Sequence, residues 1–176
     1  ATSDAEVNGT LNASLGGNQW FGSMLINSGG IYEATSETTE ITSEAASGYN
    51  LNNLGGTLTH NSGIFNITTT TATKFAPDGD SLYDLIITGT DIRFKEASET
   101  LNVANDLTVN GKLATTSTFT TFTIVGDVSV SGTLDTYTNS IVSNFGSLTI
   151  NSGGTYSATN GTTTITNESA AGFALN

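Results

Sequence analysis

Three carboxylates in residues 77–84 are the best candidates for binding a metal ion. Asp78 and Asp80 flank a glycine after the only proline of the chain, and Asp84 follows four residues later. Ca²⁺ prefers carboxylate and carbonyl oxygens on a flexible turn. The segment lacks the longer ligand pattern, ending in Glu, of an EF-hand loop. The pattern therefore favours a solvated turn, with a Ca²⁺ site at Asp78, Asp80 and Asp84 as the alternative and no other cofactor.

The chain is poor in residues for nucleophilic or acid–base catalysis. His60 is the only histidine, no nucleophile motif lies near it, and the chain has no cysteine. A catalytic triad, a His-rich metal site and a thiolate site are therefore excluded. His60 follows a Leu-Thr pair where related motifs have Val or Ile, so we expect it to point as those residues do and to have a structural role.

Carboxylate pairs can hydrolyse glycosides, and the chain has one dense acidic stretch. Its members are Glu33, Glu37, Glu40 and Glu44. Three of the four are neutral in the second copy of a repeat described below, so we interpret the stretch as a solvated face. The basic residues are few and scattered along the chain, which argues against binding acidic polysaccharide: Lys74, Arg93, Lys95 and Lys112. The sequence predicts no enzymatic activity.

Two further kinds of surface site have weaker support. Gln19 and Trp20 could present a glycan-binding site, although Trp20 could instead close an exposed end of the molecule or be a variable residue. Sequons for N-glycosylation occur at five asparagines, which a chain so rich in Asn and Thr produces by chance. They are Asn8, Asn12, Asn66, Asn160 and Asn167.

Composition excludes several classes of protein. The 176 residues suit one domain over 1–176, and only 11% are charged, with a net charge of −12. Nucleic-acid binding depends on Lys and Arg, so we exclude it. No apolar run approaches the roughly 20 residues that span a bilayer, so we expect no membrane insertion. The first residues show no initiator Met and no signal-peptide core, which indicates a processed or excerpted chain.

A long-range duplication is the strongest feature of the sequence. Gly22-Ser-Met-Leu-Ile-Asn-Ser-Gly-Gly-Ile-Tyr32 returns as Gly146-Ser-Leu-Thr-Ile-Asn-Ser-Gly-Gly-Thr-Tyr156. The match relates 22–52 to 146–176 without a gap, at a constant offset of 124 (176 − 52).

A shorter pattern lies inside this repeat. Apolar and small polar residues alternate and are followed by Asn, Ser or Thr and then Gly, as in Leu107-Thr-Val-Asn-Gly111 and Val128-Ser-Val-Ser-Gly132. Its third position recurs at spacings near 20 residues, with a longer interval that indicates an irregular coil around Tyr49: Val7, Ile26, His60, Ile87, Val109, Val130 and Ile150. Alternation with period 2 indicates strands, and Asn-Gly supplies positive φ at corners.

These periods predict an all-β fold, a single-stranded parallel β-helix (β-solenoid) of about eight coils of roughly 20 residues. Asn-Gly also suits hairpins, so an antiparallel β-sandwich is the competing fold. Aromatic residues occur about once per coil and are expected to stack as interior ladders: Tyr32, Phe65, Phe94, Phe122, Phe145, Tyr156 and Phe173.

Segments such as Gly56-Thr-Leu-Thr-His-Asn-Ser-Gly63 and Gly146-Ser-Leu-Thr-Ile-Asn-Ser-Gly-Gly154 resemble the repeat arrays of large secreted surface proteins, adhesins and phage or marine-virus fibre proteins. The resemblance spans residues 7–176 and implies a parallel β-helical stalk. It implies an extracellular, cell-surface or virion-surface location, and it supplies no active-site residues.

We therefore expect a structural module of a fibre, filament or adhesin stalk. The alternative is a glycan-binding module of a phage fibre or adhesin, which would contact surface glycans. A solenoid has open ends with unpaired strand edges, so the expected partners are other copies of the chain or further repeats of a parent chain.

Overall fold

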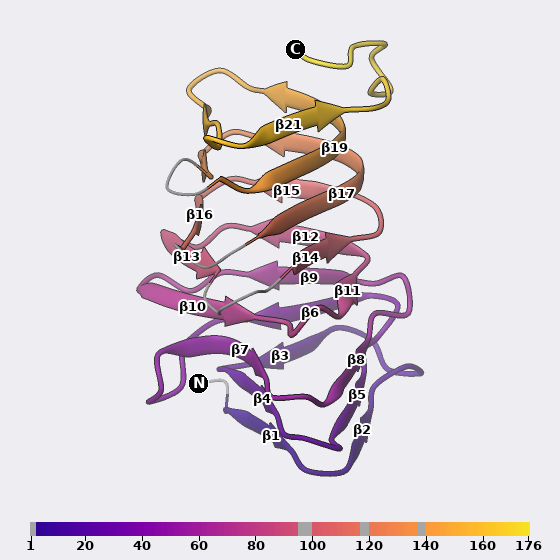
Figure 1. Ribbon diagram of the computed structural model, residues 1–176. Helices are drawn as coiled ribbons and strands as arrows, with labels where there is room; N and C mark the ends of the chain where they lie inside the picture. The colour runs from indigo at the N-terminus through magenta and orange to yellow at the C-terminus, as the bar shows by residue number, and fades with distance from the viewer. Residues whose placement is uncertain (1–2, 95–99, 117–119, 137–139) are drawn as a thin grey trace.

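The computed structural model describes residues 3–94, 100–116, 120–136 and 140–176. These residues form 21 β-strands and no helix, stacked in a single column (Figure 1). Every pairing between strands is parallel. The predicted parallel β-solenoid is confirmed, and the antiparallel β-sandwich is wrong.

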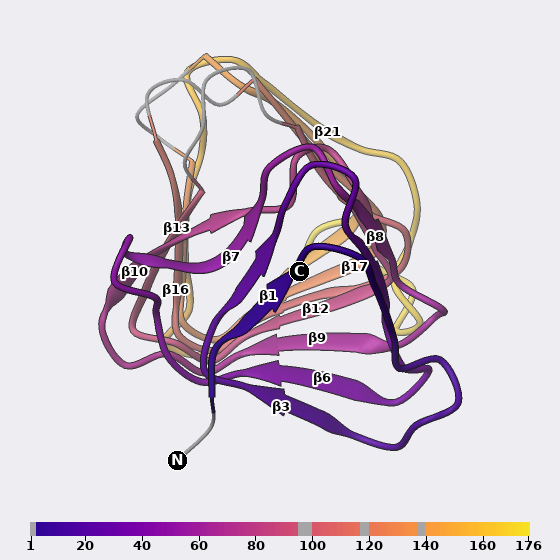
Figure 2. The same ribbon diagram turned by 90° about the horizontal axis from the view of Figure 1, so that it is seen from below.

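Three stacks of strands, here called faces 1 to 3, form the sides of the column. The chain visits faces 1, 2 and 3 in turn, so that the molecule is roughly triangular when viewed along its axis (Figure 2). Face 1 contains eight strands: β1 (Ala5–Val7), β4 (Met24–Ile26), β7 (Tyr49–Asn53), β10 (Ala72–Ala76), β13 (Asp91–Phe94), β16 (Lys112–Thr115), β18 (Thr133–Asp135) and β20 (Thr155–Ser157).

Faces 2 and 3 share two long strands, β17 (Thr121–Val130) and β19 (Val142–Ile150), whose first parts lie on face 2 and second parts on face 3. Face 2 also contains β2 (Thr10–Asn12), β5 (Ile31–Glu33), β8 (Thr57–Thr59), β11 (Ser81–Leu82), β14 (Thr100–Val103) and β21 (Thr162–Ile165). Face 3 also contains β3 (Gln19–Phe21), β6 (Thr38–Ile41), β9 (Ile64–Ile67), β12 (Asp84–Ile87) and β15 (Leu107–Val109).

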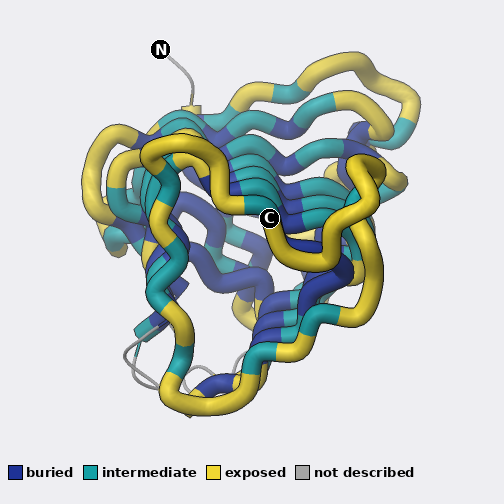
Figure 3. The backbone as a smooth tube through the Cα atoms, turned by 90° about the horizontal axis from the view of Figure 1, so that it is seen from above, coloured by how far each residue is buried: buried dark blue, intermediate teal, exposed yellow. Residues whose placement is uncertain are grey.

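The eight strands of face 1 make about seven turns, or a column roughly 35 Å tall at ~4.8 Å per strand. Residues that are register partners on successive turns lie above one another along the axis of the column. On face 3 the column Ile41, Ile67, Ile87 is joined in register and fully buried. Burying each such side chain contributes about 1.5–3 kcal/mol. Alternate residues point outward, and Figure 3 shows buried positions alternating with partly exposed ones along the stacked strands.

Aromatic rings stack along the interior, as the sequence predicts. Phe94 and Phe122 have ring centroids 6.4 Å apart, and Phe122 and Phe145 lie 5.6 Å apart and edge to face. Phe75, which the sequence prediction omits, extends this column and lies 5.0 Å from Phe94. Phe173 is an exception, because it is 52% exposed at the C-terminal end of the column.

Glycines at the corners have two different functions. Gly29 and Gly153 have positive φ, as expected for Asn-Ser-Gly. Gly111 and Gly132 follow the same kind of motif but have no positive φ, so that expectation is wrong for them. A Cβ at Gly132 would overlap the carbonyl oxygen of Gly111 one turn below. Glycine is required there because backbones of successive turns approach closely.

The predicted irregular coil lies where β7 meets β10. Tyr49 pairs with Lys74 and Leu51 pairs with Phe75, so Asn50 is an extra residue on the β7 strand. Its side chain is fully buried. Asn50 adds one residue to the long turn from Ile26 to its register partner Asn53, which spans 27 residues (53 − 26).

The two copies of the duplicated segment have the same local structure. The hydroxyl of Tyr32 is 3.0 Å from that of Thr39, and Tyr156 and Thr163, each 124 residues later, repeat the contact at 2.9 Å. The corner bond from Gly30 N to Asn27 O recurs in the second copy, where Gly154 N donates to Asn151 O. The two copies are therefore alike in local structure as well as in sequence.

The copies lie on different faces. Residues 24–26 form β4 on face 1, whereas the matching residues 148–150 form the second part of β19 on face 3. Likewise β5 is on face 2 and its counterpart β20 is on face 1. The 124-residue offset therefore spans five turns and two further faces, which leaves the motif one face short of six full turns.

Candidate functional site

The three carboxylates named as the alternative Ca²⁺ site do not converge. Asp78 is in a turn with φ of 57°. Asp80 accepts hydrogen bonds through Oδ2 from Leu58 N (2.6 Å) and Asn53 Nδ2 (3.0 Å). Asp84 contacts the next turn instead. Among the described residues, no group of three metal-ligating side chains is assembled.

The carboxylate of Asp80 joins two strands of face 2 by a hydrogen bond to the backbone. On face 2 the strands β8 and β11 are not paired with each other, and the Asp80 carboxylate accepts the N–H of Leu58 at this gap. Burial raises the pKa of Asp80, the bond from Leu58 lowers it, and the nearby Asp78 charge raises it further; the net pKa is above the ordinary value.

Asp84 belongs to a stack of carboxylates that the sequence prediction did not recognise. We call Asp84, Asp106 and Asp127 the aspartate row; they lie at the corner between faces 2 and 3 on three successive turns. Asp106 N donates to Asp84 Oδ1 (3.0 Å), and Asp127 N donates to Asp106 Oδ1 (2.7 Å). Ser147 Oγ donates to Asp127 Oδ1 (2.7 Å). Backbone and hydroxyl donors therefore offset the repulsion between stacked like charges.

The three aspartates are spaced 22 and 21 residues apart (106 − 84 and 127 − 106), close to one turn of the solenoid. This spacing is the sequence signal that identifies the aspartate row.

His60 does not take the place of the Val or Ile residues to which its motif was matched. His60 follows β8 at the corner between faces 2 and 3 and is half-buried. Its Nδ1 accepts the N–H of Ser62 (3.0 Å). Its ring lies 5.5 Å from that of Tyr83. The orientation predicted for His60 is wrong, because this Leu-Thr-His segment lies on face 2 and the Val and Ile segments lie on faces 1 and 3.

Trp20 lies on the outside of face 3 and is 56% exposed. It is in register with Glu40 of β6. Its neighbour Phe21 packs inward against Tyr32, with centroids 6.0 Å apart. The amide of Gln19 donates to Gly17 O (2.9 Å). Trp20 therefore does not close the interior, but its ring is open to a ligand from the side.

Most of the sequon asparagines are accessible. Asn8, Asn12, Asn160 and Asn167 are exposed, although Asn12 donates to the carboxylate of Glu33. Asn66 is half-buried within β9, and its Oδ1 accepts from Thr88 Oγ1 (3.3 Å).

The acidic stretch does not form a single face. Glu33 lies on face 2, Glu37 lies at the following corner, and Glu40 lies on face 3. Glu44 follows β6 towards the next corner. The four carboxylates are spread over two faces and the corners that follow them, because the chain changes face about every seven residues.

The described basic residues, in contrast, come together. Lys74, Arg93 and Lys112 lie on β10, β13 and β16, three successive strands of face 1, and we call them the basic row. Their spacing of 19 residues (93 − 74 and 112 − 93) is close to one turn, so the interpretation that they are scattered is wrong for these three. Lys74 and Arg93 are direct register partners, whereas the partner of Arg93 on β16 is Ala114, and Lys112 precedes it by two residues on the same strand. Lys95 lies outside the described residues.

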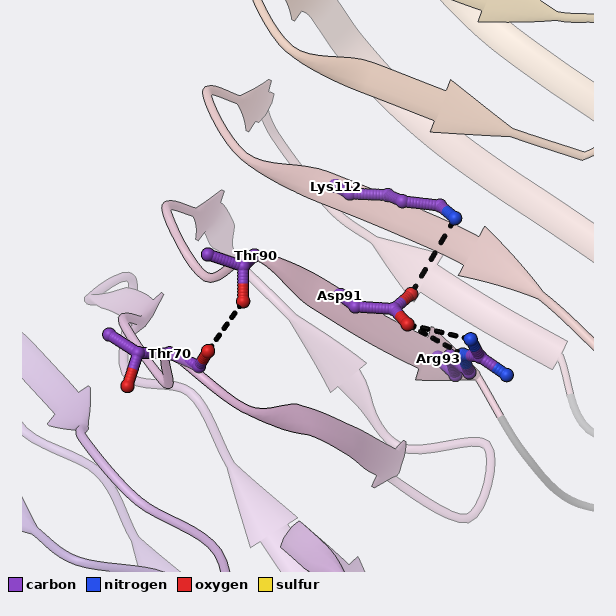
Figure 4. A network of polar contacts seen from close by, with 5 residues as sticks. All are labelled: Thr70, Thr90, Asp91, Arg93 and Lys112. Carbon is purple, nitrogen blue, oxygen red and sulfur yellow. Dashed lines mark hydrogen bonds and ion pairs between the residues drawn. The ribbon is translucent and has the colours of Figure 1, made fainter.

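Two neighbours orient the basic row. Arg93 Nη2 and Nε donate to Asp91 Oδ2 (2.6 and 3.1 Å), and Lys112 Nζ lies 3.7 Å from Asp91 Oδ1 (Figure 4). The hydrogen bond from Arg93 lowers the pKa of Asp91 and keeps it charged. Lys74 Nζ lies 4.8 Å from the centre of the Tyr49 ring. The local charge is about +2 on a chain of net charge −12.

The structure also shows a small hollow of about 250 Å³ near the N-terminal end, lined by residues 6–11. Within the described residues there is no helix that could cross a membrane. No family model, curated protein or solved structure matches this chain.

Proposed function

We propose that this chain is a structural module of an extracellular fibre, filament or adhesin stalk at a cell or virion surface, extended by stacking β-solenoid turns. The chain has no catalytic role in this proposal. Its partners are further turns of the same kind, supplied by a parent chain or by another copy.

The observation that carries the proposal is an internal comparison between the duplicated segments. Ile26 is 0% exposed, whereas its counterpart Ile150 is 37% exposed. Leu51 is 0% exposed, whereas Leu175 is 60% exposed. The first copy is covered by the turn that follows it, and the second copy is not. The same apolar positions are thus suited to being covered by another turn.

Strand edges support the same interpretation. The last turn joins the column through β21 and a bridge between Leu148 and Leu175, and its outer edge offers backbone groups that a further parallel strand can pair. Such edges favour strand addition.

The experiment is an end-specific substitution. Leu175→Asp places a charge on the uncovered end and should shorten the rods formed by the chain, as measured by electron microscopy and sedimentation. Val125→Asp is the control, because Val125 is similarly exposed, at 58%, but lies on the side of the column. Equal rod lengths for both variants would contradict stacking through this end.

A second candidate function is glycan binding at Gln19 and Trp20. The exposed indole on a flat strand surface favours it, because an aromatic face with a polar edge suits ligands that are partly apolar and partly wet. A glycan array should then give a signal that Trp20→Ala removes without changing the thermal unfolding midpoint. A blank array with the folded chain would remove this candidate.

A further inference from the structure

The basic row and the aspartate row lie on the same three turns. The turn that begins with β10 carries one residue of each row, and the same holds for the turns that begin with β13 and β16. Both rows therefore advance by one strand spacing, ~4.8 Å, per charge. Two rows of opposite charge with a common period can pair along their whole length.

The two rows also lie on opposite sides of the molecule. The basic row runs along face 1, and the aspartate row runs along the corner between faces 2 and 3, which is the corner opposite face 1 in a triangular cross-section (Figure 2). A second column translated sideways would therefore bring its aspartate corner towards the first column's basic face.

We propose that copies of this chain associate side by side, parallel and in register, with the basic row of one copy on the aspartate row of the next. This inference rests on the proposed function, because it describes how the rods bundle. A second copy is the fitting partner, because it supplies an anionic row with the matching period and length.

The neighbouring turns favour the in-register arrangement. One turn before the rows, the partner of Lys74 is Tyr49 and that of Asp84 is Ile64. One turn after them, the partner of Lys112 is Thr133, with Asp135 two residues further along the same strand, and the partner of Asp127 is Ser147. A shift of one turn therefore replaces a cation with Tyr49 in one direction and with the strand that carries Asp135 in the other. Like charges then meet in one direction and a pair is lost in the other, which selects the unshifted register.

The charged atoms are accessible on both sides. The side chains of Arg93 and Lys112 are 53% and 39% exposed. The aspartates are half-buried, and their hydrogen bonds from described residues end on Oδ1. Oδ2 of each carboxylate is left for a cation of the neighbouring copy. The contact joins two different surfaces, so each copy can bind one neighbour on either side and the assembly can grow into a layer.

The test uses two neutralising variants of the intact chain. One carries Lys74→Gln, Arg93→Gln and Lys112→Gln; the other carries Asp84→Asn, Asp106→Asn and Asp127→Asn, in which each Asn keeps an acceptor for the backbone N–H. Each should weaken side-by-side association about ten-fold or more at 0.15 M salt, as expected for three surface ion pairs. Sedimentation velocity and electron microscopy measure it.

Mixing the two variants gives the sharper result. Each retains the row that the other lacks, so a mixture should form lateral pairs that stop at two columns. The control is Glu37→Gln, Glu40→Gln and Glu44→Gln, which makes the same change in net charge as the aspartate variant, away from both rows, and should leave bundling intact. Circular dichroism and thermal melts establish that every variant is folded.

Three results would overturn the inference: wild-type rods that never bundle, row variants that bundle like the wild type, or a mixture that forms no pairs. The same electron micrographs show separately whether single rods form. Single rods without bundling would therefore reject the lateral contact and leave the proposed fibre function standing, whereas loss of rods in the wild type would reject that function.

Discussion

Met24 and Leu148 occupy equivalent positions of the duplicated segment and are both buried, yet Met24 lies on face 1 and Leu148 lies on face 3. One sequence motif therefore forms the same strand and corner on two different faces. The three faces are close to equivalent, because each needs only a short alternating strand followed by a tight corner.

This near-equivalence predicts which outward residues are neighbours in the second copy. Thr133 and Thr155 are register partners on face 1. Cysteines at both positions of this cysteine-free chain should form a disulfide on mild oxidation, since adjacent strands lie ~4.8 Å apart, within the Cα separation that a disulfide spans.

Mass spectrometry of chymotryptic peptides checks this bond, because cleavage after Leu134, Phe145 and Leu148 separates positions 133, 144 and 155. Pairing of Thr155→Cys with Asn144→Cys on face 2, in preference to Thr133→Cys, would show that the second copy keeps the face of the first and would contradict the rotation.

Close approach of successive corners makes some glycines irreplaceable. Gly132→Ala should destabilise the chain by about 1–3 kcal/mol, because its Cβ would overlap the backbone carbonyl of Gly111. Gly17→Ala is the matched control, since nothing lies within 4 Å of a Cβ there. Urea unfolding should show a lower midpoint for the first variant alone; equal midpoints would argue against the stacked corners.

The aspartate row predicts a difference between two substitutions at one position. Asp106→Ala removes the acceptor of the Asp127 N–H (2.7 Å) and should cost about 1–3 kcal/mol. Asp106→Asn keeps a side-chain oxygen and should cost less. Thermal unfolding at neutral pH measures both. A milder effect of Ala than of Asn would mean that the row has no structural hydrogen bond at this position.

The raised pKa of Asp80 predicts a pH dependence of definite sign. Its pKa is higher in the folded chain than the ordinary value of 3.8 because burial disfavours the charge. Between these two values the folded state binds more protons than the unfolded state, so Asp80 makes stability fall as pH rises through that window.

Asp80→Asn should remove this loss while keeping an acceptor for the N–H of Leu58. Urea midpoints measured across the acidic range should then decline less with rising pH than in the wild type. A steeper decline in the variant would show that the sign is wrong.

The sequence predicted the parallel solenoid, the duplication and most of the aromatic column, because alternation and corner motifs recur on every face. Because the same motifs recur on every face, the sequence does not reveal on which face each motif lies. The motif positions used as a ruler fall on different faces, with Val7 and Ile26 on face 1 and Ile87 on face 3.

The wrong predictions for individual residues arise because the sequence does not reveal which face each motif occupies. The motif predicts that His60 points as the Val and Ile residues do, whereas it lies at a corner beside Tyr83. Lys74, Arg93 and Lys112 were interpreted as scattered, because only the known turn length reveals that 19 residues return the chain to the same face.

The central claim is that uncovered turns of this solenoid take further turns and so extend a rod. Electron microscopy of the native material tests it most directly. The account predicts thin, uniform rods as wide as one triangular column, with a ~4.8 Å repeat along the axis in diffraction. Compact isolated particles, or fibres whose 4.8 Å repeat runs across the axis, would contradict it.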